Sequence, residues 1–458
     1  MESSLPSGKK TVLLITTLPS FLIPFMGSSI NIALPSIGKE FVMDAVLLGW
    51  VATAYLLSTA IFLVPFGRIA DILGRKKVFL WGITLYTFSC LLTTLSTSAM
   101  WLIAFRSFQG IGSSMVFGTS VAILTSVFPA NERGKALGIN VAAVYLGLSF
   151  GPFLGGFLTQ YLGWRSIFWA NIPLGLMVIG FAFWKLKGEW AEAQGERFDV
   201  KGSMLYGLSL AVMVYGISLL PAKSGILLGG TGLLGILGFV RYEMKTESPI
   251  FDMNLFKQNR VFAYSNLAAL INYSATFAVS FLLSLYLQYT KGFGPTKAGT
   301  ILISQPIMQA IFSPFAGRLS DKIEPRIVAS MGMALTAVGL FFLTFLTQDT
   351  TVTFIIASLI LLGFGFALFS SPNTNAVMGS IDKRFYGVAS GTLGTMRVIG
   401  MMLSIGMVMI IFSVYIGRIQ ITPEYYPRFL KSIKVAFVIF AFLCIGGVFA
   451  SIVRGKVR

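Results

Sequence analysis

A short, highly charged segment lies between two long apolar runs: Gly67-Arg-Ile-Ala-Asp71-Ile-Leu-Gly-Arg75-Lys-Lys77. A second version begins at Gly317, 250 positions later, and reads Gly317-Arg-Leu-Ser-Asp321-Lys-Ile-Glu-Pro-Arg326. Each copy again stands between apolar stretches long enough to cross a bilayer. A charged turn that recurs in the same setting indicates a membrane protein built from two related halves.

The composition supports a membrane protein. Hydrophobic residues make up 55% of the chain and charged residues 11%, whereas soluble domains carry about 25% charged residues. The apolar runs approach the roughly 20 residues that a helix needs to span a bilayer. We therefore expect an all-α polytopic membrane protein.

The hydropathy pattern predicts 14 transmembrane helices. They are expected at residues 11–35, 46–67, 78–97, 100–128, 134–162, 165–186, 202–221, 225–242, 261–289, 296–316, 327–347, 352–380, 387–416 and 432–453. The repeat matches spans one to six with spans nine to fourteen, so spans seven and eight are an insert. We expect two pseudo-symmetric six-helix bundles, at residues 1–187 and 261–458, plus two inserted helices within 188–260.

The distribution of basic residues predicts the orientation. With the N-terminus inside, 24 Lys and Arg residues fall on inner segments and 9 on outer loops, which places both termini in the cytoplasm. The net charge of +18 therefore reflects topology, and no nucleic-acid partner is expected. The expected location is the inner or plasma membrane, with the lipid bilayer as partner and the monomer as the functional unit.

Arg106 is the most unusual single residue, because it lies well inside the fourth span. A cation at this depth normally faces a wet cavity or a polar partner. Gln109, Gly110 and Ser113 share its helix face, so a polar stripe extends from it. An arginine that snorkels to the surface with a structural role is the alternative.

Two further groups suggest moving parts. Glycines at 147, 151 and 155 repeat every four residues in span five and give a smooth face for close helix contact, and Pro152 and Gly156 accompany them. This face permits either a hinge between helices or plain packing. In the charged turn, Gly67, Gly74 and Arg75 surround Asp71, which can join an ion-pair cluster or cap a helix of the other half as a latch. Asp321 is its counterpart in the second half.

Polar side chains on several spans predict a cavity between the halves. The candidates for its lining are Ser28, Asn31, Ser113, Asn272, Tyr273, Gln305, Gln309, Asn373 and Arg397. All 17 acidic residues lie outside the span centres, so no proton carrier is assigned. The chain has no histidine, no P-loop and no nucleophile–base pattern. We expect neither a cofactor nor a metal, and no enzyme activity.

Several motifs resemble those of the major facilitator superfamily, in its 14-span drug–proton antiporter branch. The Asp71 turn resembles the loop signature after span two, and Arg106-x-x-Gln-Gly-x-Gly resembles the span-four signature. Gly147–Gly156 resembles the antiporter signature Gly-x-x-x-Gly-Pro-x-x-Gly-Gly. Branch-level motifs follow at Gly163-Trp-Arg165-Ser-Ile-Phe-Trp-Ala-Asn171-Ile-Pro173-Leu-Gly175 and at Phe198-Asp199-x-x-Gly202.

The resemblance implies alternating access and export of lipophilic compounds in exchange for protons. It implies that Arg106 and Gln109 assist proton coupling, that Gly147–Gly156 forms the hinge, and that Asp71 locks the outward-open state. One departure is Met26, which stands where the branch pattern of span one, Asp-x-Thr-(apolar)₂-Asn-x-Ala-Leu-Pro, has an acid. An anionic or neutral metabolite carrier of the same fold therefore stays open, as does a non-transporting membrane sensor or scaffold.

Overall fold

A computed structural model describes residues 8–186, 188–191, 193–246, 250–251, 253–381 and 386–455. The first half contains six long helices: α1 (Lys9–Glu40), α2 (Ala45–Leu73), α3 (Arg75–Thr94), α4 (Ala99–Val127), α5 (Ala130–Leu162) and α6 (Arg165–Lys185). The inserted pair is α7 (Val200–Leu219) and α8 (Lys223–Glu243). No strand occurs in the described ranges.

The second half is less regular. Its elements are α9 (Met253–Gln258), α10 (Arg260–Thr276), α11 (Ala278–Leu285), the π-helical turn η1 (Tyr286–Thr290), α12 (Pro295–Leu302), α13 (Ser304–Lys322), α14 (Pro325–Leu343), α15 (Val352–Gly379), α16 (Tyr386–Tyr415), the 3₁₀ turn η3 (Pro423–Tyr425) and α17 (Tyr426–Val453). The ninth span is thus α10, α11 and η1 in sequence, and the tenth is α12 followed by α13. We predicted each as one span; the ninth crosses as one helix over Arg260–Thr290, and the tenth changes element at Ile303.

The structure agrees with 14 crossings. Thirteen helices within the described ranges are long and apolar enough to span a membrane. The α12–α13 pair supplies the fourteenth crossing. Its apolar stretch is shorter than those of the other spans, because it contains Ser304, Gln305 and Gln309. Polar residues at a break in a spanning helix are tolerated where the break is covered by protein. Here α5 packs against both α12 and α13.

Polar caps define several helix starts. The Asp44 carboxylate accepts the Leu47 N–H at 2.7 Å at the start of α2, and Asp199 accepts the Gly202 N–H at 2.9 Å at the start of α7. Such caps satisfy backbone N–H groups that have no partner within the helix. The remaining stability of the spans comes from packing, because lipid removes the usual hydrophobic driving force between helices.

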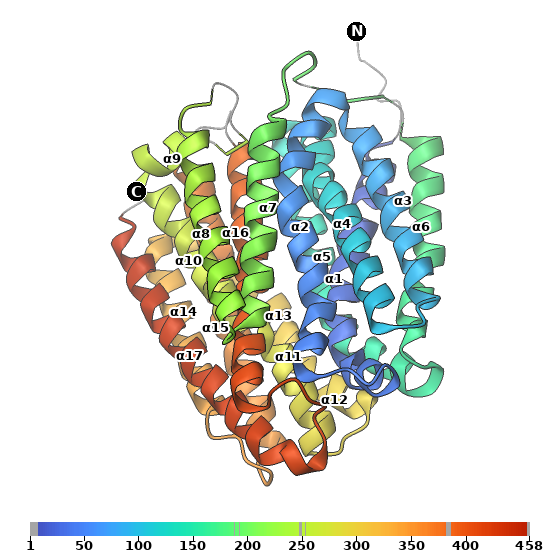
Figure 1. Ribbon diagram of the computed structural model, residues 1–458. Helices are drawn as coiled ribbons and strands as arrows, with labels where there is room; N and C mark the ends of the chain where they lie inside the picture. The colour runs from blue at the N-terminus through green and yellow to red at the C-terminus, as the bar shows by residue number, and fades with distance from the viewer. Residues whose placement is uncertain are drawn as a thin grey trace.

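The helices form two groups that meet along a central contact, as Figure 1 shows. In the first group α1 packs on α5, and α2 and α3 pack on α4; in the second α10 packs on α16 and α17, and α14 on α15. Both termini lie at the same end (Figure 1), which we call the inner end because the distribution of basic residues predicts that it faces the cytoplasm. The opposite end, with α12, is the outer end.

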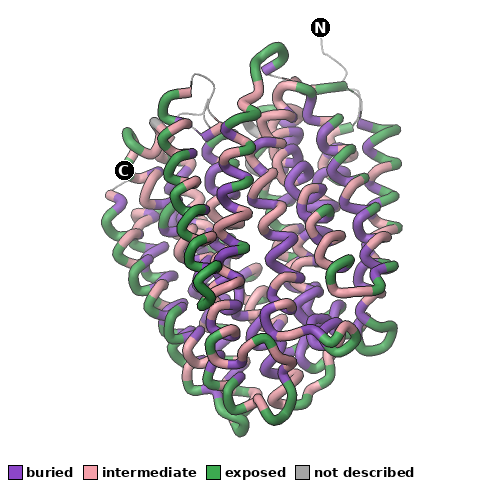
Figure 2. Tube along the Cα trace, viewed as in Figure 1, coloured by how far each residue is buried: buried purple, intermediate pink, exposed green. Residues whose placement is uncertain are grey.

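The inserted pair lies at the edge of the molecule. Helix α7 touches α2 and α16, one helix of each group, and α8 packs chiefly on α7. Figure 2 shows a long exposed face on α8 and buried positions concentrated on the helices between the two groups. Within the described residues, α8 is thus the more exposed helix of the inserted pair, and α7 contacts both groups.

Candidate functional site

Hydrogen bonds join the two halves at the outer end. The Ser284 hydroxyl of α11 donates to the Asn31 carbonyl of α1 at 2.6 Å. Gln288 donates its side-chain N–H to the Ile32 carbonyl at 2.9 Å, and the Thr296 N–H donates to the Gln160 amide oxygen at 3.0 Å. We call this set the outer gate. Among described residue pairs, each hydrogen bond between spans 1–6 and spans 9–14 lies in the outer half of the molecule.

Small residues bring the backbones of the two halves into contact beside the outer gate. A Cβ added to Gly156 of α5 would lie 2.4 Å from the Pro295 carbonyl oxygen of α12. A Cβ on Gly299 would lie 2.0 Å from the Pro152 oxygen, so this contact admits no side chain from either helix. At the same end a Cβ on Gly49 of α2 would lie 2.6 Å from Met409 of α16.

The inner end lacks such backbone contacts in the described residues. Its nearest approach across the halves at a glycine is Gly394 of α16, whose added Cβ would lie 3.7 Å from Leu63 of α2, an ordinary van der Waals distance. Among the described residues, the hydrogen bonds and close glycine contacts between the halves are therefore concentrated at the outer end. This asymmetry is what one state of an alternating-access cycle requires.

The span-five glycines serve two different contacts. Gly147, Gly151 and Gly155 face α1 of the same half, where added Cβ atoms would meet Phe21, Ser28 and Ser29 respectively. The Ser29 hydroxyl also donates to the Gly151 carbonyl at 2.9 Å. The close contacts of the motif with the other half involve Pro152 and Phe153, beside Gly299, and Gly156, beside Pro295. The hinge role of this motif stays a prediction.

Arg106 lies inside the first group of helices, with 1% of its surface exposed. Its Nε donates to the Val51 carbonyl of α2 at 3.2 Å, its Nη1 donates to the Gln109 amide oxygen, and its guanidinium lies 4.4 Å from the centre of the Tyr55 ring. Gln109 in turn donates to the Cys90 sulfur of α3 at 3.0 Å. We expected Arg106 to face either a wet cavity or a polar partner. In this state it has polar partners and does not line an open passage.

Ser113 extends the same network. It accepts a hydrogen bond from the Tyr55 hydroxyl at 2.9 Å and is fully buried. The predicted polar stripe on α4 therefore faces α2 and α3 of its own half. Its part in proton coupling or in a cavity stays a prediction.

Arg397 occupies a different environment on α16. It is half-buried, donates from Nη2 to the Thr374 hydroxyl of α15 at 2.7 Å, and lies 5.7 Å from the centre of the Tyr273 ring of α10. Its buried Nε has no hydrogen-bond partner. Tyr145 of α5 is close enough to Tyr273 to interact electrostatically, so this group faces the opposite half. A half-buried guanidinium with an unused donor can bind an anionic group.

The other predicted cavity residues are mostly enclosed. Asn373 is 1% exposed and accepts a hydrogen bond from the Arg454 Nη1 at 2.8 Å, within the second group of helices. Asn272 is fully buried and neither of its amide atoms has a partner. Gln309 is buried, and the Gln305 oxygen is buried without a partner. Asn31 and Ser28 lie on α1, at the outer gate and against α5 respectively.

Arg454, which was not among the predicted site residues, contacts Ser265 and Asn373. Its guanidinium is fully buried at the inner end of α17, with Ser265 at 3.3 Å and Asn373 as partners and with Nε and Nη2 unpartnered. A C-terminal basic residue is usually a topology determinant. Its burial follows from the tertiary contact of α17 with α10, which no local pattern reports.

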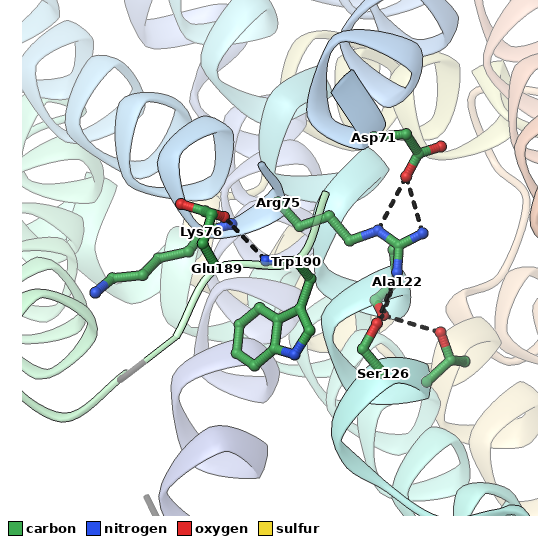
Figure 3. Close-up of polar contacts among 8 residues, drawn as sticks. Asp71, Arg75, Lys76, Ala122, Ser126, Glu189 and Trp190 are labelled. Atoms are coloured by element: carbon green, nitrogen blue, oxygen red, sulfur yellow. Dashed lines mark hydrogen bonds and ion pairs between the residues drawn. The ribbon is translucent and has the colours of Figure 1, made fainter. Parts of the chain in front are cut away.

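The charged turn is tighter than we predicted (Figure 3). Helix α2 continues to Leu73 and α3 begins at Arg75, so Gly74 alone makes the turn, with φ at 114°. That conformation favours glycine. Gly67 lies within α2, where it packs beside Gly118 of α4. The predicted turn, Gly67–Lys77, is therefore wrong in extent.

Asp71 and Arg75 form the expected ion pair, with Nη2 2.8 Å from the carboxylate oxygen. Arg75 also donates to the Ser126 hydroxyl of α4 at 2.6 Å (Figure 3). These contacts stay within one half, so the latch to the other half is not formed in this state among the described residues. Asp321 lies in the last turn of α13, and the latch role of both acids stays a prediction.

A connecting segment after α6, which the sequence analysis did not place here, covers the turn. The Arg75 N–H donates to the Trp190 carbonyl at 2.9 Å, and the Glu189 carboxylate accepts the Lys76 N–H at 2.8 Å (Figure 3). Glu196 pairs with Arg68. The signal that could have revealed this contact is charge complementarity between an acidic connector and a basic turn.

Comparison with known proteins agrees with this architecture. The family model of the Major Facilitator Superfamily matches residues 17–264 and again residues 265–456. The riboflavin transporter RibZ of Clostridioides difficile is 31% identical, over 85% of both chains. The multidrug resistance protein Stp of Mycobacterium tuberculosis is 30% identical, over 85% of this chain and 73% of its own length. The cephamycin export protein CmcT of Amycolatopsis lactamdurans is 30% identical, over 87% and 84%.

Solved structures share the fold at lower sequence identity. A bacterial homolog of the human lysosomal transporter Spinster, in an inward-facing and unoccupied conformation, has a TM-score of 0.68 at 17% identity and covers 97% of this chain and 96% of its own. The human organic anion transporter MFSD10 has a TM-score of 0.67 at 14% identity, over 97% and 99%. At this identity the likeness establishes the fold alone.

Proposed function

Since the chain belongs to the Major Facilitator Superfamily and is a membrane transporter rather than an enzyme, we propose that it exports hydrophobic or amphipathic compounds by alternating access, in exchange for protons. The observation that carries the proposal is the asymmetric contact between the halves. The outer gate is closed by a few hydrogen bonds and by glycine contacts that can part at low cost, and the described residues show no such close glycine contact between the halves at the inner end.

Relatives support the class of cargo. Stp is named as a multidrug resistance protein, and CmcT as a cephamycin export protein. The antiporter-type motif at Gly147–Gly156 agrees with exchange transport. In the proposed cycle, binding at the half-buried faces around Tyr273 and Arg397 is followed by closure of the inner end and parting of the outer gate.

Proton coupling is assigned to Arg106 with Gln109. An arginine buried beside polar groups and without an acid in its surroundings is sensitive to any nearby change of protonation. Purified protein in liposomes, loaded with a lipophilic dye and given a pH gradient, tests the assignment. We expect gradient-driven dye flux in the wild type and its loss in Arg106→Ala. Equal flux in both proteins contradicts the coupling role.

A second candidate is a carrier of anionic or neutral metabolites with the same fold. Arg397 favours it, because a half-buried guanidinium and the absence of acids from the span centres make the contact region positively biased. RibZ is named as a riboflavin transporter, which supports a cargo of this kind. Binding of cationic and anionic dyes to purified protein separates the two candidates. Tight binding of cations alone contradicts the second one.

A further inference from the structure

Two carboxylates meet at the inner end of the inserted helix pair. Asp199 caps the start of α7, and Glu243 is the last residue of α8. The Asp199 Oδ2 and the Glu243 Oε1 lie 2.3 Å and 2.8 Å from the position that a Cβ on Gly202 would occupy. The two oxygens therefore converge on one point, which is open only because residue 202 is glycine.

Donors satisfy the other oxygen of each carboxylate. The Asp199 Oδ1 accepts the Gly202 N–H at 2.9 Å and the Tyr242 hydroxyl at 3.2 Å. The Glu243 Oε2 accepts the Phe251 N–H at 2.9 Å. These contacts hold both side chains in place, so the approach of the two remaining oxygens is fixed by the fold.

The converging oxygens are buried and have no partner. Glu243 is 2% exposed, and both the Asp199 Oδ2 and the Glu243 Oε1 are shielded from solvent without a hydrogen bond. The titratable groups around Glu243 are Asp199 at the start of α7 and Tyr242 on α8, and Tyr206 of α7 stacks on Phe251 nearby. Within the described part of the chain, no Lys or Arg forms a salt bridge with either acid.

We propose that Glu243 carries a proton in the folded protein, with Glu243 Oε1–H donating to Asp199 Oδ2. Two ionised carboxylates this close and this buried repel each other, and one proton both removes a charge and supplies the missing hydrogen bond. Gly202 keeps the space for that bond open. The inner end of α7 and α8 is then a proton-binding site, distinct from Arg106.

Loss of the proton has a structural consequence. With both carboxylates ionised, the end of α8 and the start of α7 are pushed apart. The segment just before Asp199 is bonded to the charged turn, because the Ala193 N–H donates to the Asp71 carbonyl at 2.9 Å and Glu196 pairs with Arg68. The site is therefore placed to transmit inner pH to the turn at Gly74.

Infrared spectroscopy of purified protein tests whether Glu243 carries this proton. At neutral pH we expect the wild type to show the carbonyl stretch of a protonated carboxyl group. Both Glu243→Gln and Asp199→Asn remove that band, because an amide donates the same hydrogen bond without a titrating proton. The control, Glu196→Gln, changes an exposed carboxylate and leaves the band. Persistence of the band in both amide variants overturns the proposal.

Thermal unfolding gives a second readout. A proton held by the folded protein but released by the unfolded chain makes the free energy of unfolding fall as pH rises. Burial raises the pKa of the Glu243 carboxyl, so we expect the wild-type Tm to fall as pH rises above the ordinary range of a glutamate, and this dependence to be reduced in Glu243→Gln. If that variant does not fold, Asp199→Asn, which retains the Oδ1 acceptor, is measured instead. A Tm that responds to sodium or potassium at fixed pH, rather than to pH, overturns the proposal in favour of a metal cation.

Discussion

The contact between Gly156 and Pro295 gives a quantitative test of the outer gate. In Gly156→Ala the new Cβ lies 2.4 Å from the Pro295 oxygen, about 1 Å closer than the 3.4 Å at which ordinary contact begins. The new Cβ is attached to the backbone of α5 and the Pro295 oxygen belongs to the backbone of α12. The clash is therefore relieved only when the two halves separate. Overpacking of this kind costs about 1–3 kcal/mol. Because the clash exists only while the gate is closed, a cost of about 2 kcal/mol shifts the population toward the open gate by roughly 30-fold.

Thiol labelling measures the shift. Ser284 is fully buried at the gate, and the native Cys90 and Cys444 are also buried. In a Ser284→Cys background, a membrane-impermeant maleimide added from the outside reports opening of the gate. We expect Gly156→Ala to raise the labelling rate by about an order of magnitude or more, and Gly299→Ala, which clashes with the Pro152 oxygen from the other side, to do the same.

Two variants in the same helix are matched controls. A Cβ on Gly151 meets Ser28 and Phe25 of its own half, so Gly151→Ala lowers stability in both states and leaves the equilibrium between them unchanged. Gly138 has open space around it, and Gly138→Ala is expected to change neither property. A labelling rate that stays slow in Gly156→Ala, or that rises equally in Gly151→Ala, contradicts the claim that the Gly156–Pro295 contact exists only while the outer gate is closed.

Three further substitutions test other contacts. Arg397→Gln is expected to weaken binding of anionic amphiphiles by about tenfold, the loss of one charged hydrogen bond, while binding of neutral analogues in the same equilibrium assay is unchanged; equal loss for both cargoes contradicts the anion contact. Arg454→Gln leaves Asn373 and Ser265 without their charged donor and is expected to lower the free energy of unfolding by about 1–3 kcal/mol in a denaturant titration; an unchanged midpoint contradicts it. Arg75→Gln removes a partly buried ion pair with Asp71 and the hydrogen bond to Ser126. Its Tm should therefore fall more than that of Glu196→Gln, which loses an exposed ion pair worth under about 1 kcal/mol. Similar Tm values for the two variants contradict this ranking.

The helices and their grouping were predictable because the bilayer imposes them. Span length, the repeated charged turn and the small-residue face of α5 all follow from local sequence, and the structure agrees with fourteen crossings. The break at Ile303 was missed because hydropathy averages over a window. The extent of the Gly74 turn was missed because charged residues such as Arg68 and Asp71 continue α2 beyond the bilayer.

The placement of single polar side chains was less predictable. The periodicity of α4 correctly puts Arg106, Gln109 and Ser113 on one face, but it does not say which helix that face meets. The structure turns it toward α2 and α3 of the same half. Likewise Asn373 was expected in a cavity and is bonded to Arg454, a residue 81 positions away. Such pairings depend on long-range packing that a single sequence does not encode locally.

The most direct test of alternating access is to tie the outer gate shut. Gln160 and Thr296 stand on opposite halves and are hydrogen-bonded across the gate. In the double variant Gln160→Cys and Thr296→Cys, a short cleavable bifunctional thiol reagent bridges the halves. We expect dye flux in liposomes to fall to background when the bridge is closed and to return when it is cleaved. Dye flux at the unbridged rate with the bridge intact would contradict it.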